Sequence, residues 1–150
     1  MQGFSRLAGI VALALASGAF AQIPPDAEGR ALLIGKWYGE FACENCGERD
    51  QLKWTRVNAA DGNQRVHFRY YYQGKLQESV LRLGQWGYQN GIYWLTCEAY
   101  FVEGSPRPCP DLKYEFVVEF LSSERMTYRS DKYRIRYSAR RVPDDFEITD

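Results

Sequence analysis

Apolar and polar residues alternate with a period of two along much of the chain, a pattern typical of strands with one buried face. Three segments show it most clearly, and their apolar faces consist of Val66, Phe68, Tyr70 and Tyr72, of Tyr114, Phe116, Val118 and Phe120, and of Tyr133, Ile135, Tyr137 and Ala139. The opposite faces of these segments are mostly charged. No long stretch after residue 33 shows helical periodicity. The pattern therefore predicts an all-β protein.

The alternating segments and the turn signals between them predict eight strands. We expect these at residues 34–43, 51–58, 64–73, 76–88, 91–102, 112–121, 124–130 and 132–142. The pairs Asp61-Gly62, Gly74-Lys75 and Asn90-Gly91 favour tight turns. Short turns between successive strands produce an antiparallel meander, and closing it removes both sheet edges. The expected fold is an eight-stranded antiparallel up-and-down β-barrel.

The first 21 residues have the organisation of a secretory signal peptide. Arg6 is followed by an uncharged segment that ends in Ala19-Phe20-Ala21, a cleavage site of the A-x-A type. The apolar run is too short to span a bilayer, which needs roughly 20 residues, so we expect no membrane insertion. We expect a secreted or periplasmic protein, cleaved near Ala21.

The rest of the chain divides into three parts. Residues 22–33, which contain Pro24-Pro25, are expected to form an extended lead-in. Residues 34–142 form the predicted barrel, and residues 143–150 form a C-terminal tail. Residues 1–150 carry 19 basic and 19 acidic side chains. This balance argues against nucleic acid as a partner, because phosphate binding relies on a basic surface.

Four cysteines follow the predicted signal peptide, and an even number in an exported chain indicates two disulfides. Local pairing of Cys43 with Cys46 and of Cys97 with Cys109 is the first choice, and pairing between the two regions is the alternative. Cys43 and Cys46 form a C-x-x-C motif, but no βαβ pattern surrounds it. We therefore expect disulfides that brace the rim of the barrel, rather than a redox centre or a metal site.

One short motif resembles a known family. Gly35-Lys36-Trp37-Tyr38 opens the first predicted strand, and Arg141-Val142 ends the last one. A G-x-W-Y motif on the first strand of an eight-strand meander resembles the lipocalins and the wider calycin group, in particular the small bacterial lipocalin-like domains. The resemblance covers about residues 34–142. It implies that Trp37 packs across the closed base of the barrel, and alternation makes Arg141, rather than Arg140, the residue that stacks on it.

The sequence shows no set of catalytic residues. His67 is the single histidine, and alternation places it outside the barrel. The chain contains no G-x-S-x-G, P-loop or H-E-x-x-H motif. We therefore expect no enzymatic activity and no cofactor.

Aromatic residues at inward positions near the open end are the candidate ligand contacts. These are Phe41, Tyr70, Phe101, Tyr114, Phe116, Tyr128 and Tyr133, with Leu52 and Tyr72 beside them. An eight-stranded barrel is just wide enough to be filled by side chains or to hold one small ligand, and both interpretations stay open here.

The leading hypothesis is a non-enzymatic protein that binds a small, partly apolar molecule at the barrel mouth. Such binding needs a cavity on the order of 300 Å³. The alternative is a protein-binding module, such as a secreted inhibitor. It would act through the loop between the first two strands and the loop between the fifth and sixth.

Overall fold

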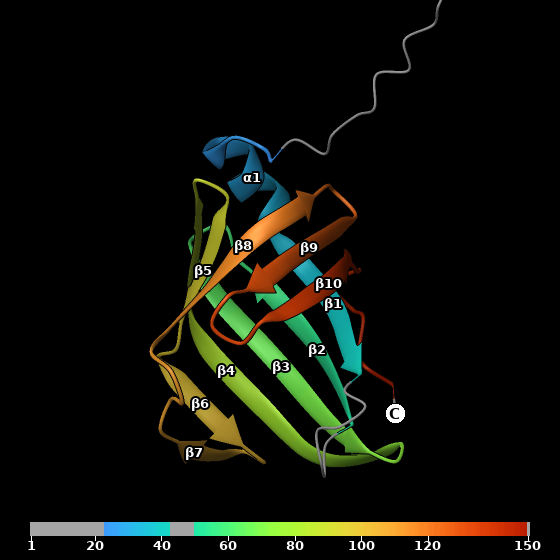
Figure 1. The fold of residues 1–150 in the computed structure, drawn as a ribbon. Coiled ribbons are helices and arrows are strands. Elements are labelled where there is room, and N and C mark those ends of the chain that lie inside the picture. Colours follow the sequence, from blue (N-terminus) through green and yellow to red (C-terminus); the bar gives the residue numbers. More distant parts are fainter. Residues whose placement is uncertain (1–22, 43–49, 150) are drawn as a thin grey trace, which may run out of the picture.

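The computed structural model describes residues 23–42 and 50–149. These residues form one helix and ten strands, whose arrangement is shown in Figure 1. The helix α1 (Asp26–Leu33) precedes the strands. The strands are β1 (Gly35–Ala42), β2 (Gln51–Asn58), β3 (Asn63–Tyr72), β4 (Lys75–Gln89), β5 (Ile92–Thr96), β6 (Ala99–Val102), β7 (Ser105–Arg107), β8 (Lys113–Leu121), β9 (Arg125–Ser130) and β10 (Ile135–Arg141).

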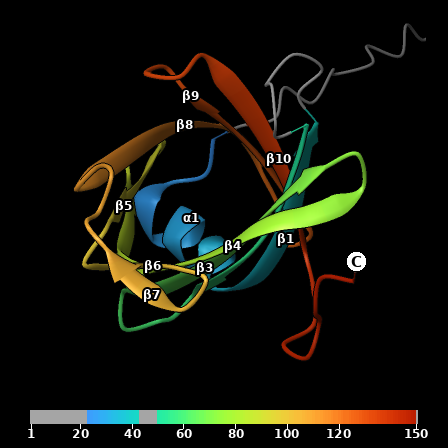
Figure 2. The same cartoon turned by 90° about the horizontal axis from the view of Figure 1, so that it is seen from below.

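The strands close into a barrel. The order of pairing is β3-β2-β1-β10-β9-β8-β5-β4, and a further pairing of β3 with β4 completes the ring. Every one of these pairings is antiparallel, as in an up-and-down barrel. Figure 2 looks along the barrel and shows α1 across its far end. The expected eight-stranded antiparallel barrel is confirmed.

The fifth predicted strand, 91–102, is split into β5 and β6. Leu83 pairs with Ala99, and Trp86 pairs with Leu95. Two residues of β4 therefore lie opposite three residues of the other chain segment, and the extra residue reverses which side chains face inward beyond the break. Beyond the break, β6 pairs with β7 instead of β8.

The tight turns have left-handed backbone conformations. Asn90 and Gly91 have φ values of 52° and 75°, as a two-residue hairpin turn requires. Gln73 and Gly74 form the same kind of pair, one residue earlier than the predicted Gly74-Lys75 turn. A third pair, Glu103-Gly104, forms the β6–β7 hairpin within a segment that the sequence pattern predicted to be a long loop.

The prediction of an extended lead-in over residues 22–33 is wrong, because residues Asp26–Leu33 form α1. Pro25 precedes the first helical residue, a position where the missing N–H of proline costs nothing. Asp26 and Glu28 lie in the first turn and Arg30 in the last, so their charges complement the helix dipole. Pro24-Pro25 therefore starts a helix where the sequence interpretation expected it to prevent one.

The helix docks on the end of the barrel formed by β4 and β5. An ideal Cβ at Gly29 would lie 2.1 Å from Tyr88 Cε1, so only glycine allows this approach. Tyr88 Oη donates to Pro24 O at 3.1 Å, and Asn90 N donates to Asp26 Oδ1 at 2.6 Å. The guanidinium of Arg30 lies 4.7 Å from the centre of the Trp86 ring.

The C-terminal segment lies against the outer face of β1, β2 and β3. Arg69 Nη1 donates to Ile148 O at 3.0 Å, Lys53 Nζ donates to Thr149 O at 3.2 Å, and Lys36 Nζ donates to Asp144 O at 2.6 Å. Ile148 is buried by this contact. Within the described ranges, no helix is long and apolar enough to cross a membrane.

Candidate functional site

Trp37 and Arg141 close the base of the barrel together. Trp37 is fully buried, and the Arg141 guanidinium lies 4.5 Å from the centre of its ring, as the sequence predicted. Arg141 also donates from Nε to Ser123 O and from Nη1 to Ile34 O, both at 2.6 Å, and from Nη2 to Leu32 O. The arginine therefore ties the end of β10 to the end of α1 and to the β8–β9 turn.

A polar network lies above this base, inside the barrel. Gln64 Nε2 donates to Tyr93 Oη at 2.6 Å and to Asn58 Oδ1 at 3.0 Å. Tyr93 Oη donates to the same Asn58 oxygen at 3.0 Å, and Asn58 Nδ2 donates to Leu33 O at 2.9 Å. The three side chains satisfy one another and leave this end of the interior well packed.

A cavity of about 190 Å³ lies inside the barrel, towards the other end. Its wall is mainly aromatic, with two arginines. The lining residues are Leu52, Trp54, Arg56, Val66, Phe68, Tyr70, Arg82, Leu95, Tyr100, Pro110, Tyr114, Phe116, Tyr128, Tyr133 and Tyr137. The barrel is therefore neither completely filled nor as hollow as the 300 Å³ expected for a drug-sized ligand.

Most of the sequence-predicted contacts lie on this wall, namely Tyr70, Tyr114, Phe116, Tyr128 and Tyr133. Leu52 lies there too. Phe41 instead packs against the core, with its ring 6.0 Å from that of Tyr137.

The inward placement predicted for Phe101 is wrong, because the extra residue between β5 and β6 turns Tyr100 towards the cavity and pairs Phe101 with Leu81. Tyr72, predicted beside these contacts, is 37% exposed and does not line the cavity. The register shift after Tyr70 adds its extra residue to β4, so β3 keeps its alternation, and Tyr71 is buried on the outer face, where Lys53 Nζ lies 4.6 Å from the centre of its ring.

Two buried arginines, which the sequence interpretation did not single out, face the same cavity. Arg56 is 3% exposed and Arg82 is 7% exposed. Arg56 Nη2 donates to Tyr128 Oη at 3.3 Å, and its guanidinium lies 4.8 Å from the Tyr93 ring centre. The Arg82 guanidinium lies 4.5 Å from the ring of Tyr114 and 5.2 Å from that of Phe68. Each arginine also has a buried Nε without a hydrogen-bond partner.

Two tyrosines of the interior, Tyr93 and Tyr137, are neutral at physiological pH. Burial raises the pKa of Tyr93 to about 12, although the positive charges of Arg56 and Arg82 act in the opposite direction. Burial likewise raises the pKa of Tyr137 to about 12. These two hydroxyls therefore add no negative charge to the interior.

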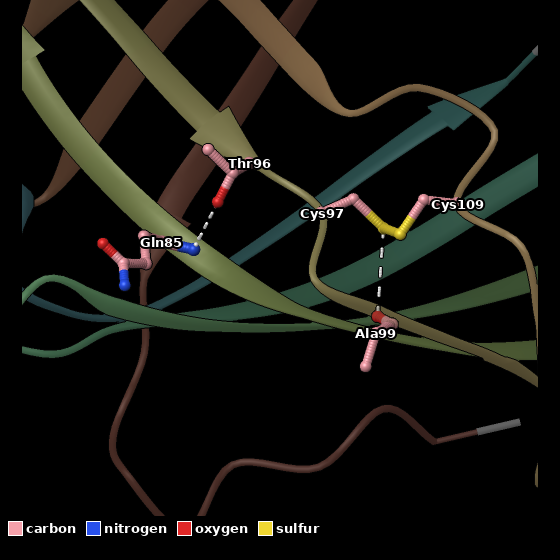
Figure 3. The surroundings of a disulfide bond; sticks show 5 residues. All are labelled: Gln85, Thr96, Cys97, Ala99 and Cys109. Carbon is pink, nitrogen blue, oxygen red and sulfur yellow. Dashed lines mark hydrogen bonds between the residues drawn. A yellow bond between two sulfur atoms is a disulfide. The ribbon is translucent and has the colours of Figure 1, made fainter.

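The disulfide between Cys97 and Cys109 fastens one side of the cavity rim, as predicted. Figure 3 shows the bond, with Cys97 Sγ 3.9 Å from Ala99 O at the start of β6. Cys109 precedes Pro110, which lines the cavity, so the bond holds the β7–β8 loop against the opening. Cys43 and Cys46 lie outside the described residues.

An ionic cluster fastens the same loop to the β9–β10 turn. Lys132 Nζ lies 2.7 Å from Asp111 Oδ1, and Tyr133 Oη donates to Asp111 Oδ2. Hydrogen bonds from Lys132 and Tyr133 lower the pKa of Asp111. On the described side of the rim, a disulfide and an ionic cluster therefore hold the β7–β8 loop in place.

A second hollow adjoins the cavity from the side. It measures about 370 Å³ and lies beside the part of β8 that extends past the end of β9. Its walls are Lys113–Val117 on one side and Ser130–Tyr133 on the other. Tyr114, Phe116 and Tyr133 belong to the walls of both spaces. These three rings therefore separate the interior from a solvent-open groove.

The remaining chemistry of the described residues is sparse. His67 lies on the outer face, where its Nε2 is 2.7 Å from Ser79 Oγ, and burial together with Arg69 and Arg65 lowers its pKa. No group of three or more His, Cys, Asp or Glu side chains that could hold a metal ion occurs among the described residues.

Comparison with known proteins gives no match. No protein-family model matches the chain, and no curated protein matches it.

Proposed function

We propose that this protein is an exported, non-enzymatic binding protein that holds one small, partly apolar molecule inside the barrel. The observation that carries the proposal is the 190 Å³ cavity with its aromatic wall. An apolar cavity of about 150 Å³ is enough to bind benzene, so the space suits a molecule with a single ring or an aliphatic group of similar bulk. The ligand is then smaller than those usual for drug-sized pockets.

The architecture around the cavity supports this function. Trp37, Arg141 and α1 close the base, which leaves the rim and the side groove as routes for a molecule among the described residues. The Cys97–Cys109 disulfide and the ion pair between Lys132 and Asp111 hold the rim in place, which reduces the conformational entropy lost on binding. Displacement of the Tyr133 side chain, which is 43% exposed, would connect the cavity to the side groove.

A titration with neutral one-ring compounds tests the proposal. Toluene and benzyl alcohol are added to the mature, disulfide-bonded protein, and backbone amide shifts are followed by NMR. Saturable shifts with one binding site, concentrated on the cavity wall, are the expected result. A complete lack of saturable binding across these compounds and their charged analogues would refute the proposal and favour the alternative of a protein partner at the loops.

A matched pair of variants locates the site. Val66 is 1% exposed and lines the cavity, whereas Val57 is 37% exposed on the outer face. Val66→Phe fills the cavity and should abolish binding. Val57→Phe adds the same side chain outside the barrel and should leave the affinity unchanged.

A further inference from the structure

Two positive charges lie side by side in the interior of the barrel. Val66 of β3 pairs with Arg56 of β2 on one side and with Arg82 of β4 on the other. The two arginines therefore flank one valine in a single row across the sheet, and strand spacing puts their Cα atoms about 10 Å apart. Two long arginine side chains that start at this separation can both reach one small group in the cavity.

Among the residues that the structure describes, neither arginine has an anionic partner. None of the ion pairs among the described residues includes Arg56 or Arg82. The wall of the cavity contains no aspartate or glutamate. The hydroxyl of Tyr93 does not serve as a counterion, because burial keeps it protonated well above neutral pH. Within residues 23–42 and 50–149, the two cations of the interior are thus uncompensated.

The contacts that the arginines make are only partial substitutes for water. Arg56 donates to a tyrosine hydroxyl and a methionine sulfur and lies between two rings. Arg82 contacts two aromatic rings and has no side-chain hydrogen bond within the part of the chain that the structure describes. Ring faces stabilise a cation, but they do not satisfy guanidinium N–H groups. An arrangement with unmet donors aimed at an open cavity is the complement of an anion.

We infer that the ligand of the cavity is a small organic anion, a carboxylate on a single ring or on an aliphatic group of similar size. Its negative group lies between Arg56 and Arg82, and its apolar body lies against the aromatic wall. This inference rests on the proposed function and narrows it to one chemical class. The planar fork of each guanidinium suits the two oxygens of a carboxylate.

Benzoate and its neutral isostere benzamide provide the direct test. Both are titrated into the mature protein by calorimetry, in a buffer without chloride or phosphate. We expect benzoate to bind at least ten-fold more tightly than benzamide, because a charged group pairs with the arginines and an amide does not. Chloride is titrated separately, since a simple ion can also lie between two arginines.

Each outcome has a distinct meaning. Equal affinities for benzoate and benzamide overturn the inference while leaving the proposed function intact. Binding of neither compound, nor of the neutral one-ring compounds, overturns both. In a further outcome, chloride gives a calorimetric signal of binding while benzoate gives no comparable signal and does not compete with chloride. That result overturns the inference that the ligand is an organic anion.

Variants of the arginines connect the preference to these residues. Arg56→Met and Arg82→Met should each bring the ratio of the affinities for benzoate and benzamide towards one, while benzamide still binds. Arg125→Met removes an exposed positive charge outside the barrel and should leave the preference unchanged. In the absence of ligand, Arg82→Met should melt no lower than the wild type, because no anionic partner is lost. A clear loss of stability with no change in preference would show that Arg82 has a purely structural role.

Discussion

The closed base of the barrel allows a quantitative test of how Trp37 and Arg141 act together. Trp37→Ala removes a fully buried indole, a truncation that costs about 3–5 kcal/mol. The loss of its Nε1 hydrogen bond adds little, because Leu33 O also accepts from Asn58 Nδ2 at 2.9 Å. The fall in the free energy of unfolding should therefore come from truncation of the buried ring, including its contact with Arg141.

Arg141→Ala should be destabilising for a different reason. It removes hydrogen bonds to Leu32 O, Ile34 O and Ser123 O as well as the contact with the indole. Because the arginine is partly exposed, we expect a net loss of about 2–3 kcal/mol, less than the sum of three charged hydrogen bonds. Part of this loss depends on Trp37, so the two substitutions should be coupled by about 1–2 kcal/mol.

A double-mutant cycle measures the coupling. Urea unfolding is followed by far-UV circular dichroism, through which every variant reports the loss of its strands. Arg140→Ala serves as the control, because Arg140 lies outside the barrel against Tyr38 and Phe146. Additivity of the Trp37 and Arg141 substitutions within about 0.3–0.5 kcal/mol would refute the coupled base.

Three further predictions concern the helix, the rim and the tyrosines. Gly29→Ala should lower stability by about 1–3 kcal/mol through overlap with Tyr88, although helix propensity alone favours alanine by about 1 kcal/mol; a more stable variant in urea unfolding would show that α1 is not docked. Replacing Cys97 and Cys109, which are 12 residues apart, with alanine should cost about 3 kcal/mol by the chain-entropy model, and an unchanged unfolding midpoint would contradict this. Burial raises the pKa of Tyr38, Tyr93 and Tyr137 from 10.0 to about 12. The unfolded chain therefore loses these protons first, and stability should be full below pH 10 and fall between pH 10 and 12. Absorbance of tyrosinate together with circular dichroism measures this, and unfolding that sets in below pH 9 would point to other groups.

Alternation along the strands was sufficient to predict the barrel and most of its inner wall. It correctly placed Tyr114, Phe116 and Tyr128 on the cavity wall. It failed for Phe120, because a register shift between Val118 and Phe120 pairs this residue with Thr127, and Leu121 packs against the core instead. It failed for Phe101, because the segment Thr96-Cys97-Glu98 contains no glycine or proline to mark the extra residue. The extra residue is evident only once the partner strand is known.

The arginines could have been found from the sequence, at least in part. In the segment 51–58, alternation puts Arg56 on the same face as Leu52 and Trp54, which is unusual for a charged residue. What the pattern could not show is that no acidic residue of the described ranges lies opposite, since this depends on side chains from β5, β8 and β9. The helix was missed because α1 has only eight residues, too few for a clear helical period.

The pairing of β1 with β10, which closes the barrel, governs how quickly this chain can finish folding. Each hairpin from β2 to β5 joins neighbouring segments and can form as soon as both strands are present. The pairing of Trp37 with Arg141, in contrast, joins positions about 100 residues apart and requires nearly the whole chain. Until that step, β1 and β10 are open edges that can pair with another molecule. Substitutions at the base should therefore increase aggregation during folding by more than their equilibrium cost implies.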